Sequence, residues 1–232
     1  MLSIIIPAFN ESYNLKRNIP RLVEYLNSRN IEREIIVSED GSTDDTCEIL
    51  KRFSEVYGVL HLHYKKRRGK GAALKKAGPY TKYGKIIFID ADMPVNLDSF
   101  ETMIKELETN DIVIGSRYLR EQDMRTRTFK RLLLGRTYQL LVKVFFPKLK
   151  ISDTQCGFKG FKRDVFIDLN KKTRTNGWSW DLEFLVNARK RGLKIKELPT
   201  RWKDNKKTNV NLFADTFLMF LEIFAIRLAT FF

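Results

Sequence analysis

Short apolar runs alternate with amphipathic stretches along the first half of the chain. The apolar runs predict strands over residues 2–6, 34–38, 59–64, 86–89 and 111–115. Apolar residues every three or four positions predict helices over 14–29, from Thr43 or Asp44 to Tyr57, and over 71–82. Strands separated by helices of this length favour an α/β fold with a mostly parallel sheet flanked by helices.

The second half of the chain is less regular. Residues 119–146 form a basic, partly amphipathic stretch, and residues 178–191 predict a helix. We expect one catalytic domain over 1–202, a polar linker over 203–211 and an amphipathic helix over 212–232. Asp215 and Glu222 share one narrow face of that helix. Its broad apolar face could lie in a membrane interface, pack on a partner such as a second copy, or cover the domain's own core, and the first two are favoured.

Charge indicates an anionic partner. The 232 residues carry a formal net charge of +15, and the isoelectric point is about 9.8. Nucleic acid, a lipid headgroup surface and a phosphorylated substrate all fit such a balance. Nucleic acid is disfavoured because neither interleaved aromatic residues nor a recognisable binding module accompanies the basic run at 65–71.

The sequence lacks the residue patterns that several classes of chemistry require. Cys47 and Cys156 have no metal-binding or redox spacing, which suits a reducing cytoplasmic compartment. His61 and His63 have no other metal ligand near them in sequence, and their alternation suits a strand, so they are interpreted as structural. Neither a nucleophile elbow nor a dinucleotide fingerprint is present. The first residues do not form a signal peptide, and no clean membrane-spanning helix is expected.

The ends of the predicted strands carry the polar clusters. Carboxyl ends of parallel strands meet at one edge of a sheet, so these clusters predict one site. They are Asn10-Glu11, Glu39-Asp40, Asp90-Ala91-Asp92 and Ser116-Arg117.

Two features of that edge predict phosphate chemistry. Asp90 and Asp92 stand one residue apart where a strand ends, and they can share Mg²⁺ or Mn²⁺ with a diphosphate. The basic run 65–71 opens a helix at Gly71, where backbone N–H groups and the helix dipole favour an anion. Each feature alone is also compatible with a solvated loop, and their combination is what favours the site.

The motifs, taken in order, resemble the family 2 glycosyltransferases with the GT-A fold. They are SIIIPAFNE, SEDGSTDDT, GKGAALKKA, FIDADM, GSRY, DTQCGFKGF and WSWDLEF. The last two resemble most closely the polyprenyl-phosphate hexose synthases, which include dolichyl-phosphate glucose and mannose synthases. The resemblance covers about residues 2–199.

The resemblance implies a role for each matching residue. A nucleotide-sugar site would comprise Pro7, Phe9, Glu11, Ser38, Asp40, Gly71, Asp90, Ala91 and Asp92, and the metal would be held by Asp90 and Asp92. Arg117 and Arg131 would receive the phosphate of the acceptor. The catalytic residues would be Asp92, Asp153, Gln155 and Asp181. Asp153 and Gln155 would face the sugar, while Asp181 and Glu183 would lie near the reacting centre or hold its frame.

The implied activity is an inverting, metal-dependent transfer of a hexose to dolichyl or polyprenyl phosphate. The donor would be UDP-glucose or GDP-mannose, and the enzyme would sit on the cytoplasmic face of a membrane as a peripheral or monotopic protein. A family 2 enzyme that glycosylates a sugar hydroxyl is the alternative. Two departures from the family pattern stand out: Met93-Pro94 follows the metal motif, and residues 202–209 lack a Gly-Ser element.

Overall fold

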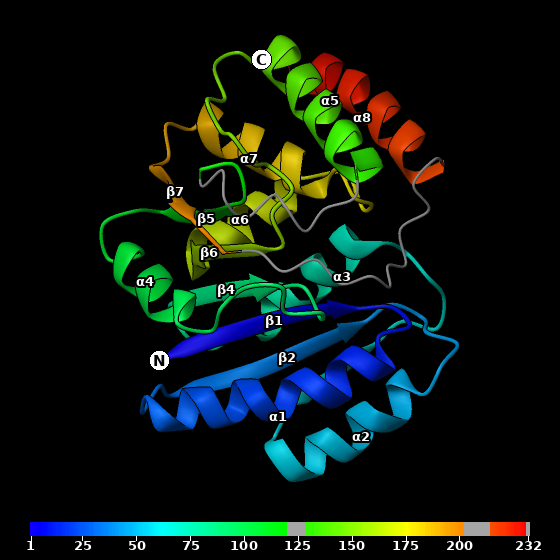
Figure 1. The fold of residues 1–232 in the computed structure, drawn as a ribbon, viewed down its shortest axis with the longest axis vertical. Coiled ribbons are helices and arrows are strands. Elements are labelled where there is room, and N and C mark those ends of the chain that lie inside the picture. The colour runs from blue at the N-terminus through cyan, green and yellow to red at the C-terminus, as the bar shows by residue number, and fades with distance from the viewer. Residues whose placement is uncertain (120–128, 202–213, 231–232) are drawn as a thin grey trace.

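A seven-stranded mixed sheet forms the centre of the molecule (Figure 1), as seen in a computed structural model that describes residues 1–119, 129–201 and 214–230. The strand order is β3-β2-β1-β4-β6-β5-β7. The strands are β1 (Leu2–Ala8), β2 (Arg33–Glu39), β3 (Leu60–His63), β4 (Lys85–Ile89), β5 (Ile112–Ser116), β6 (Phe158–Lys162) and β7 (Ile195–Pro199).

Helices cover both faces of this sheet, as the alternating sequence pattern predicts. They are α1 (Ser12–Ser28), α2 (Thr46–Tyr57), α3 (Lys70–Ala77), α4 (Ser99–Glu106), α5 (Phe129–Phe145), α6 (Arg163–Lys172), α7 (Trp180–Lys190) and α8 (Ala214–Thr230), with a 3₁₀ turn at Gly78–Tyr80. One apolar core joins the sheet to α1, α2 and α4, and a second joins it to α3 and α5–α8. The α/β class is therefore confirmed.

Alternation within the central strands divides their side chains between the two cores. In β1, Ile4 and Ile6 belong to the core under α1, whereas Ile5 belongs to the core under α3. In β4, Ile87 faces the first core and Phe88 the second. A strand that buries both faces reads as a continuous apolar run, which is why the sequence predicts these strands.

Strand β6 makes the sheet mixed. It lies between β4 and β5 and runs antiparallel to both, whereas the remaining pairs are parallel. Residues of the second half of the chain thereby enter the centre of the sheet. The antiparallel insertion of β6 brings residues 153–161 beside Asp90, whose N–H donates to the Gly157 carbonyl (2.9 Å). The sequence pattern does not predict β6, β7, α4 or α6.

Helix α8 covers the domain's own core with one face and exposes the other. Ile223 and Ile226 are buried against α5 and α7, and Phe145 packs on Phe224 with ring centroids 4.7 Å apart. Leu221 is 50% exposed on the opposite side. The expected linker at 203–211 lies outside the described residues. Within the described part of the chain, no helix is long and apolar enough to cross a membrane.

Candidate active site

A cavity opens where β1, β2 and β4 end, which is the edge that the sequence pattern indicates. Its volume is about 190 Å³, and it is partly open to solvent. Its lining residues are Pro7, Ala8, Phe9, Glu11, Asn14, Asp40, Arg67, Gly69, Lys70, Ala73, Asp90, Ala91, Asp92, Gly177 and Trp178. The cavity therefore joins the three strand-end clusters of the first half to the loop before α7.

The loop after β4 presents the two carboxylates. Its turn is closed by a bond from the Met93 N–H to the Asp90 carbonyl (2.9 Å), and Met93 adopts a left-handed φ of 43°. The buried amide of Asn18 in α1 donates to the Ala91 carbonyl (3.0 Å). Asp90 and Asp92 are thus held on a fixed turn at the cavity wall, as predicted.

Gly157, in the loop before β6, lies directly against the Asp90 carboxylate. A Cβ atom at residue 157 would overlap Asp90 Oδ2. We expect Gly157→Ala to displace this carboxylate and reduce turnover at least about tenfold, a loss of the size seen when the support of a metal ligand is removed. Gly84→Ala is the matched control, since its Cβ would meet nothing within 4 Å. Equal activity of the two variants, with thermal melts showing both folded, would contradict this placement of Asp90.

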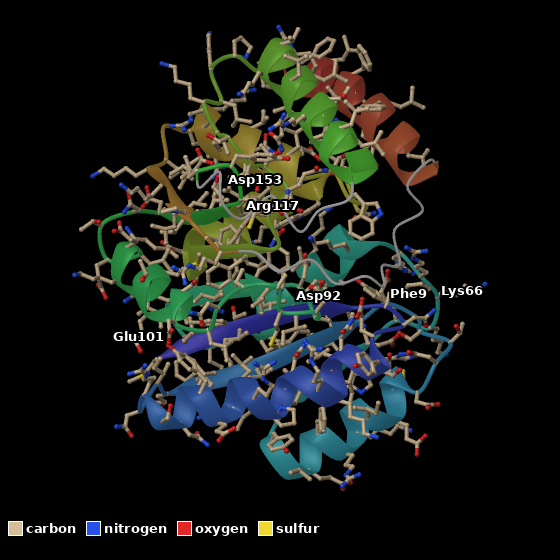
Figure 2. The ribbon with its side chains drawn as sticks, viewed as in Figure 1. Phe9, Lys66, Asp92, Glu101, Arg117 and Asp153 are labelled. Carbon is tan, nitrogen blue, oxygen red and sulfur yellow. The ribbon has the colours of Figure 1, made fainter. Side chains whose placement is uncertain are left out.

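The basic loop before α3 is anchored by Asp40. One carboxylate oxygen accepts the Arg68 N–H and the other accepts the Gly69 N–H, each at 2.7 Å. Burial raises the pKa of Asp40 above its ordinary value, although these bonds and Arg67 oppose the rise. The Arg67 guanidinium lies over the Phe9 ring, 4.2 Å from its centroid. Asp40 therefore brings cationic groups to the cavity wall (Figure 2, where Phe9 and the neighbouring Lys66 are labelled).

Two lysines connect the cavity to Asp181: Lys70 belongs to the basic run that predicts an anion site, whereas no sequence pattern singles out Lys159. The Lys70 ammonium lies 3.1 Å from Asp90 Oδ1 and 3.6 Å from Asp181 Oδ2. Lys159, only 1% exposed, donates to Asp181 Oδ1 (2.5 Å) and to the Cys156 carbonyl (2.6 Å). Asp181 thus lies behind the cavity and fixes both lysines. Asp181 does not itself line the cavity.

Glu183 holds the loop that forms the far wall of the cavity. Its carboxylate accepts the Arg174 and Thr175 N–H groups at 2.8–3.0 Å. The Asn176 carbonyl of the same loop accepts the Ala72 N–H of α3 (3.0 Å). This loop leads to Trp178, whose ring lies 5.8 Å from the Lys70 ammonium. The WSWDLEF segment therefore supplies part of the cavity wall through Trp178 and anchors the neighbouring loop through Glu183.

Arg117 and Asp153 form a buried bidentate pair, which Figure 2 shows beside each other above Asp92. Arg117 Nε lies 2.6 Å from Asp153 Oδ2, and a second guanidinium nitrogen lies 2.8 Å from Oδ1. Asp153 is fully buried, while the Arg117 side chain keeps 12% of its surface exposed. Burial alone would raise the pKa of Asp153, but Arg117 outweighs burial and holds the pKa below its ordinary value.

Three other predicted residues do not line the cavity, and the side chain of a fourth is not described. Gln155 is half-buried, and its side-chain amide approaches the Met219 sulfur of α8 (3.9 Å). Ser38 is buried within β2, and Gly71 packs tightly on Trp180, where a Cβ would come within 2.6 Å of the Trp180 Cβ. Arg131 falls within α5, and its side chain lies outside the described residues.

The donor set of Asp90 and Asp92 fits a hard divalent cation. Both carboxylates line one cavity, and oxygen ligands suit Mg²⁺ or Mn²⁺. The Lys70 ammonium beside Asp90 shows that this carboxylate already has a cationic neighbour. These residues can therefore hold a metal together with a diphosphate.

The fold brings the two histidines close to two other potential metal ligands. His61 and His63 lie on β3, as expected, yet ligand atoms of Glu39, Cys47 and both histidines all lie within 4.8 Å of one another. Sequence spacing concealed this because Cys47 comes from α2 and Glu39 from β2.

A cavity lined by carboxylates and cations lies at the strand ends of the α/β fold. Residues 3–169 match the family model described as "Glycosyl transferase family 2". The chain therefore belongs to glycosyltransferase family 2.

Curated relatives include named glycosyltransferases from distant organisms. The chain is 32% identical over 219 residues to Glycosyltransferase AglD of Haloferax volcanii, covering 92% of this chain and 35% of that protein. It is 35% identical over 216 residues to dolichyl-phosphate beta-glucosyltransferase ALG5D of Trichomonas vaginalis (88% and 66%). For the Drosophila melanogaster dolichyl-phosphate beta-glucosyltransferase the identity is 31% over 241 residues (97% and 74%). The chain thus spans from about one third to three quarters of these relatives' lengths.

Solved structures share the fold. Glucosyl-3-phosphoglycerate synthase of Mycobacterium tuberculosis in complex with UDP superposes with a TM-score of 0.71, at 18% identity, over 98% of this chain and 80% of that one. A complex of that protein with Mn²⁺, UDP-glucose and phosphoglyceric acid gives a TM-score of 0.70 at 17% identity, over 98% and 79%. These likenesses confirm the GT-A-like fold.

Proposed function

We propose that this protein transfers glucose from UDP-glucose to dolichyl or a similar polyprenyl phosphate, with inversion at the anomeric carbon. The observation that carries the proposal is the single cavity that gathers Asp40, Asp90 and Asp92 with Lys70 and Arg67. The names of the relatives from Trichomonas vaginalis and Drosophila melanogaster support glucose over mannose and a β-linked product. An α-linked donor and a β-linked product require displacement from one face.

The donor's diphosphate would lie against the Asp90–Asp92 turn. Asp90 and Asp92 would hold Mg²⁺ or Mn²⁺, which supplies positive charge to the departing diphosphate. Lys70 adds a fixed ammonium beside Asp90, and its own position is set by Asp181. The nucleoside end would occupy the wall formed by Phe9 and Arg67.

The acceptor needs cations and no strong base. A lipid phosphate is ionised near pH 7, so its oxygen can attack the anomeric carbon directly while the bond to the diphosphate breaks. Two anions must then be brought together, which requires positioning cations. Arg117 fits this task, because Asp153 fixes its guanidinium bidentately while part of its side chain stays exposed. Arg131 is assigned to the same task on the family resemblance.

The outer faces of α5 and α8 would dock the enzyme on the cytoplasmic leaflet of a membrane. We call them the apolar end surface, defined by Leu133, Leu140, Val144, Leu218, Leu221, Phe224 and Leu228, each at least 47% exposed. Arg136 and Lys143 are exposed on α5 among these leucines. A surface that mixes leucine with cations suits an interface with anionic lipid, where each well-placed cation contributes about 1 kcal/mol.

Replacing Leu140 and Leu221 with glutamate is expected to weaken binding to phosphatidylserine-containing vesicles at least about tenfold. The two apolar side chains would no longer enter the lipid, and the glutamates would be repelled by the anionic headgroups. Sedimentation with vesicles measures this. Val56→Glu is the matched control, since Val56 is 59% exposed on α2, at the far end of the molecule from α5 and α8 (Figure 1). Unchanged sedimentation of the double variant would refute the docking, and dimerisation of the wild type without vesicle binding would favour a second copy as occupant.

The activity is tested with radiolabelled UDP-glucose, GDP-mannose and dolichyl phosphate in the presence of Mn²⁺ or Mg²⁺. Label from UDP-glucose is expected in the organic phase, and acid-labile glucosyl phosphate in the β configuration identifies the product. Label from GDP-mannose alone would correct the donor. Water-soluble product with a sugar acceptor, and none with lipid phosphate, would instead support the alternative activity on a hydroxyl group.

A further inference from the structure

A second cluster of metal-binding side chains lies next to the nucleotide cavity. Glu39 ends β2, immediately before Asp40, while His61 and His63 lie on β3 opposite Val37 and Glu39. Cys47 comes from the first turn of α2. Three elements thus place a carboxylate, a thiol and two imidazoles on one side of the sheet edge.

The distances within the cluster approach those of a tetrahedral site. Zinc bonds of about 2.0–2.3 Å place neighbouring ligand atoms about 3.3–3.8 Å apart. Cys47 Sγ lies 3.6 Å from His63 Nδ1, and all four ligand atoms lie within 4.8 Å of one another. His63 Nδ1 is hydrogen-bonded to Glu39 Oε2. Side-chain movements of about 1 Å would therefore suffice to surround an ion.

One polar group of the cluster lacks the partner that its burial calls for. His61 Nε2 is buried and has no hydrogen-bond partner among the described residues. Glu39 is fully buried, and its carboxylate accepts the Ser42 N–H and is hydrogen-bonded to His63 Nδ1. A buried nitrogen is normally hydrogen-bonded or bound to a metal, so His61 supports a metal site at this cluster.

We propose that Glu39, Cys47, His61 and His63 bind one Zn²⁺ ion, at a site separate from Asp90 and Asp92. Imidazole and thiolate ligands favour Zn²⁺, whereas Mg²⁺ and Mn²⁺ prefer sites made of oxygen. On binding, the Cys47 thiol releases its proton to solvent, and each histidine binds through an unprotonated ring nitrogen. The ion joins β2, β3 and α2 beside Asp40, which anchors the basic loop. This site is independent of the proposed activity.

Zinc binding is tested on the full chain after treatment with a chelator. Titration with Zn²⁺ against a chromophoric chelator is expected to give one equivalent, and Co²⁺ is expected to give a thiolate charge-transfer band. Cys47→Ser and His63→Gln should each weaken binding at least about tenfold, and Cys47→Ser should lose the band. Zn²⁺ should also raise the melting temperature of the wild type and leave that of Cys47→Ser unchanged.

Controls separate this site from every other thiol and from the diphosphate site. The chain contains two cysteines, so Cys156→Ser removes the other thiol, and Asp92→Asn impairs the diphosphate-side metal site. Both variants are expected to bind Zn²⁺ as the wild type does, with circular dichroism confirming that they are folded. Absence of stoichiometric binding, wild-type binding by Cys47→Ser, or loss of binding in Asp92→Asn would each overturn the proposal.

Discussion

Asp92→Asn is expected to reduce glucosyl transfer by about 10²–10³, because it removes an anionic ligand of the metal that would neutralise the departing diphosphate, and losing one group that stabilises such a charge has an effect of this size. The substitution preserves the size of the side chain on a half-buried turn, so the melting temperature should change little. Initial rates with UDP-glucose and dolichyl phosphate measure the effect. EDTA should abolish wild-type turnover, and added Mn²⁺ should restore it.

Asp98→Asn provides the control for this loss. Asp98 stands in the segment that follows the same turn, and its side chain is 65% exposed in a 3.7 Å ion pair with Arg29. The Asp98→Asn substitution removes one negative charge, as Asp92→Asn does, but outside the cavity. Turnover should therefore stay within about twofold of the wild-type rate, as expected for a screened surface charge. Retention of most activity by Asp92→Asn, or equal losses in both variants, would refute the assignment of Asp92 to the diphosphate.

Asp153→Asn is expected to lower the free energy of unfolding by about 3–5 kcal/mol, because it leaves the Arg117 charge buried without its partner. Thermal melts should show a fall in the melting temperature on the order of 10 °C for a chain of this size. The folded-state pKa of Asp153 lies below its ordinary value. The pair therefore stabilises the protein above the ordinary carboxyl pKa, and this contribution is lost as the pH falls through the lowered pKa.

A double variant separates the structural role of this pair from its role in catalysis. Arg117→Met with Asp153→Leu should recover much of the stability, since apolar residues can replace a buried ion pair. It should still fail to use dolichyl phosphate, because no cation remains to position the acceptor. Asp168→Asn breaks an exposed pair with Arg191 and should leave the melting temperature nearly unchanged. Acceptor turnover by the stable double variant would show that Arg117 serves the fold alone.

The apolar strands could be predicted from sequence, while β6 could not. Runs such as Ile86–Ile89 within β4 are buried on both faces and carry the signal themselves. The β6 sequence FKGFK instead has Lys159 at a buried position, where the 1% exposed ammonium is satisfied by Asp181. A lysine between aromatic residues resembles a surface strand or loop, so the pattern gives no indication of a central strand.

The cavity followed from strand ends, whereas its supporting charges did not. Asp40, Asp90 and Asp92 stand directly after predicted strands, and the parallel pairing of β1 with β2 and β4 brings them to one edge. Lys70 appeared within a basic run that is typical of a solvated loop. Its burial depends on Asp181, a residue of a helix far along the chain, and sequence spacing carries no record of that contact.

The antiparallel strand β6 also sets the order in which the enzyme can mature during synthesis. Among the described strands, β5 pairs with β6 and β7 alone, and β4 keeps one edge open until β6 arrives. A nascent chain that ends after β5 would therefore carry an unpaired apolar edge, which is prone to aggregation. The Asp90 carboxylate gains its Gly157 contact only when this strand has left the ribosome, so a fragment released before residue 157 would hold the metal motif without its support.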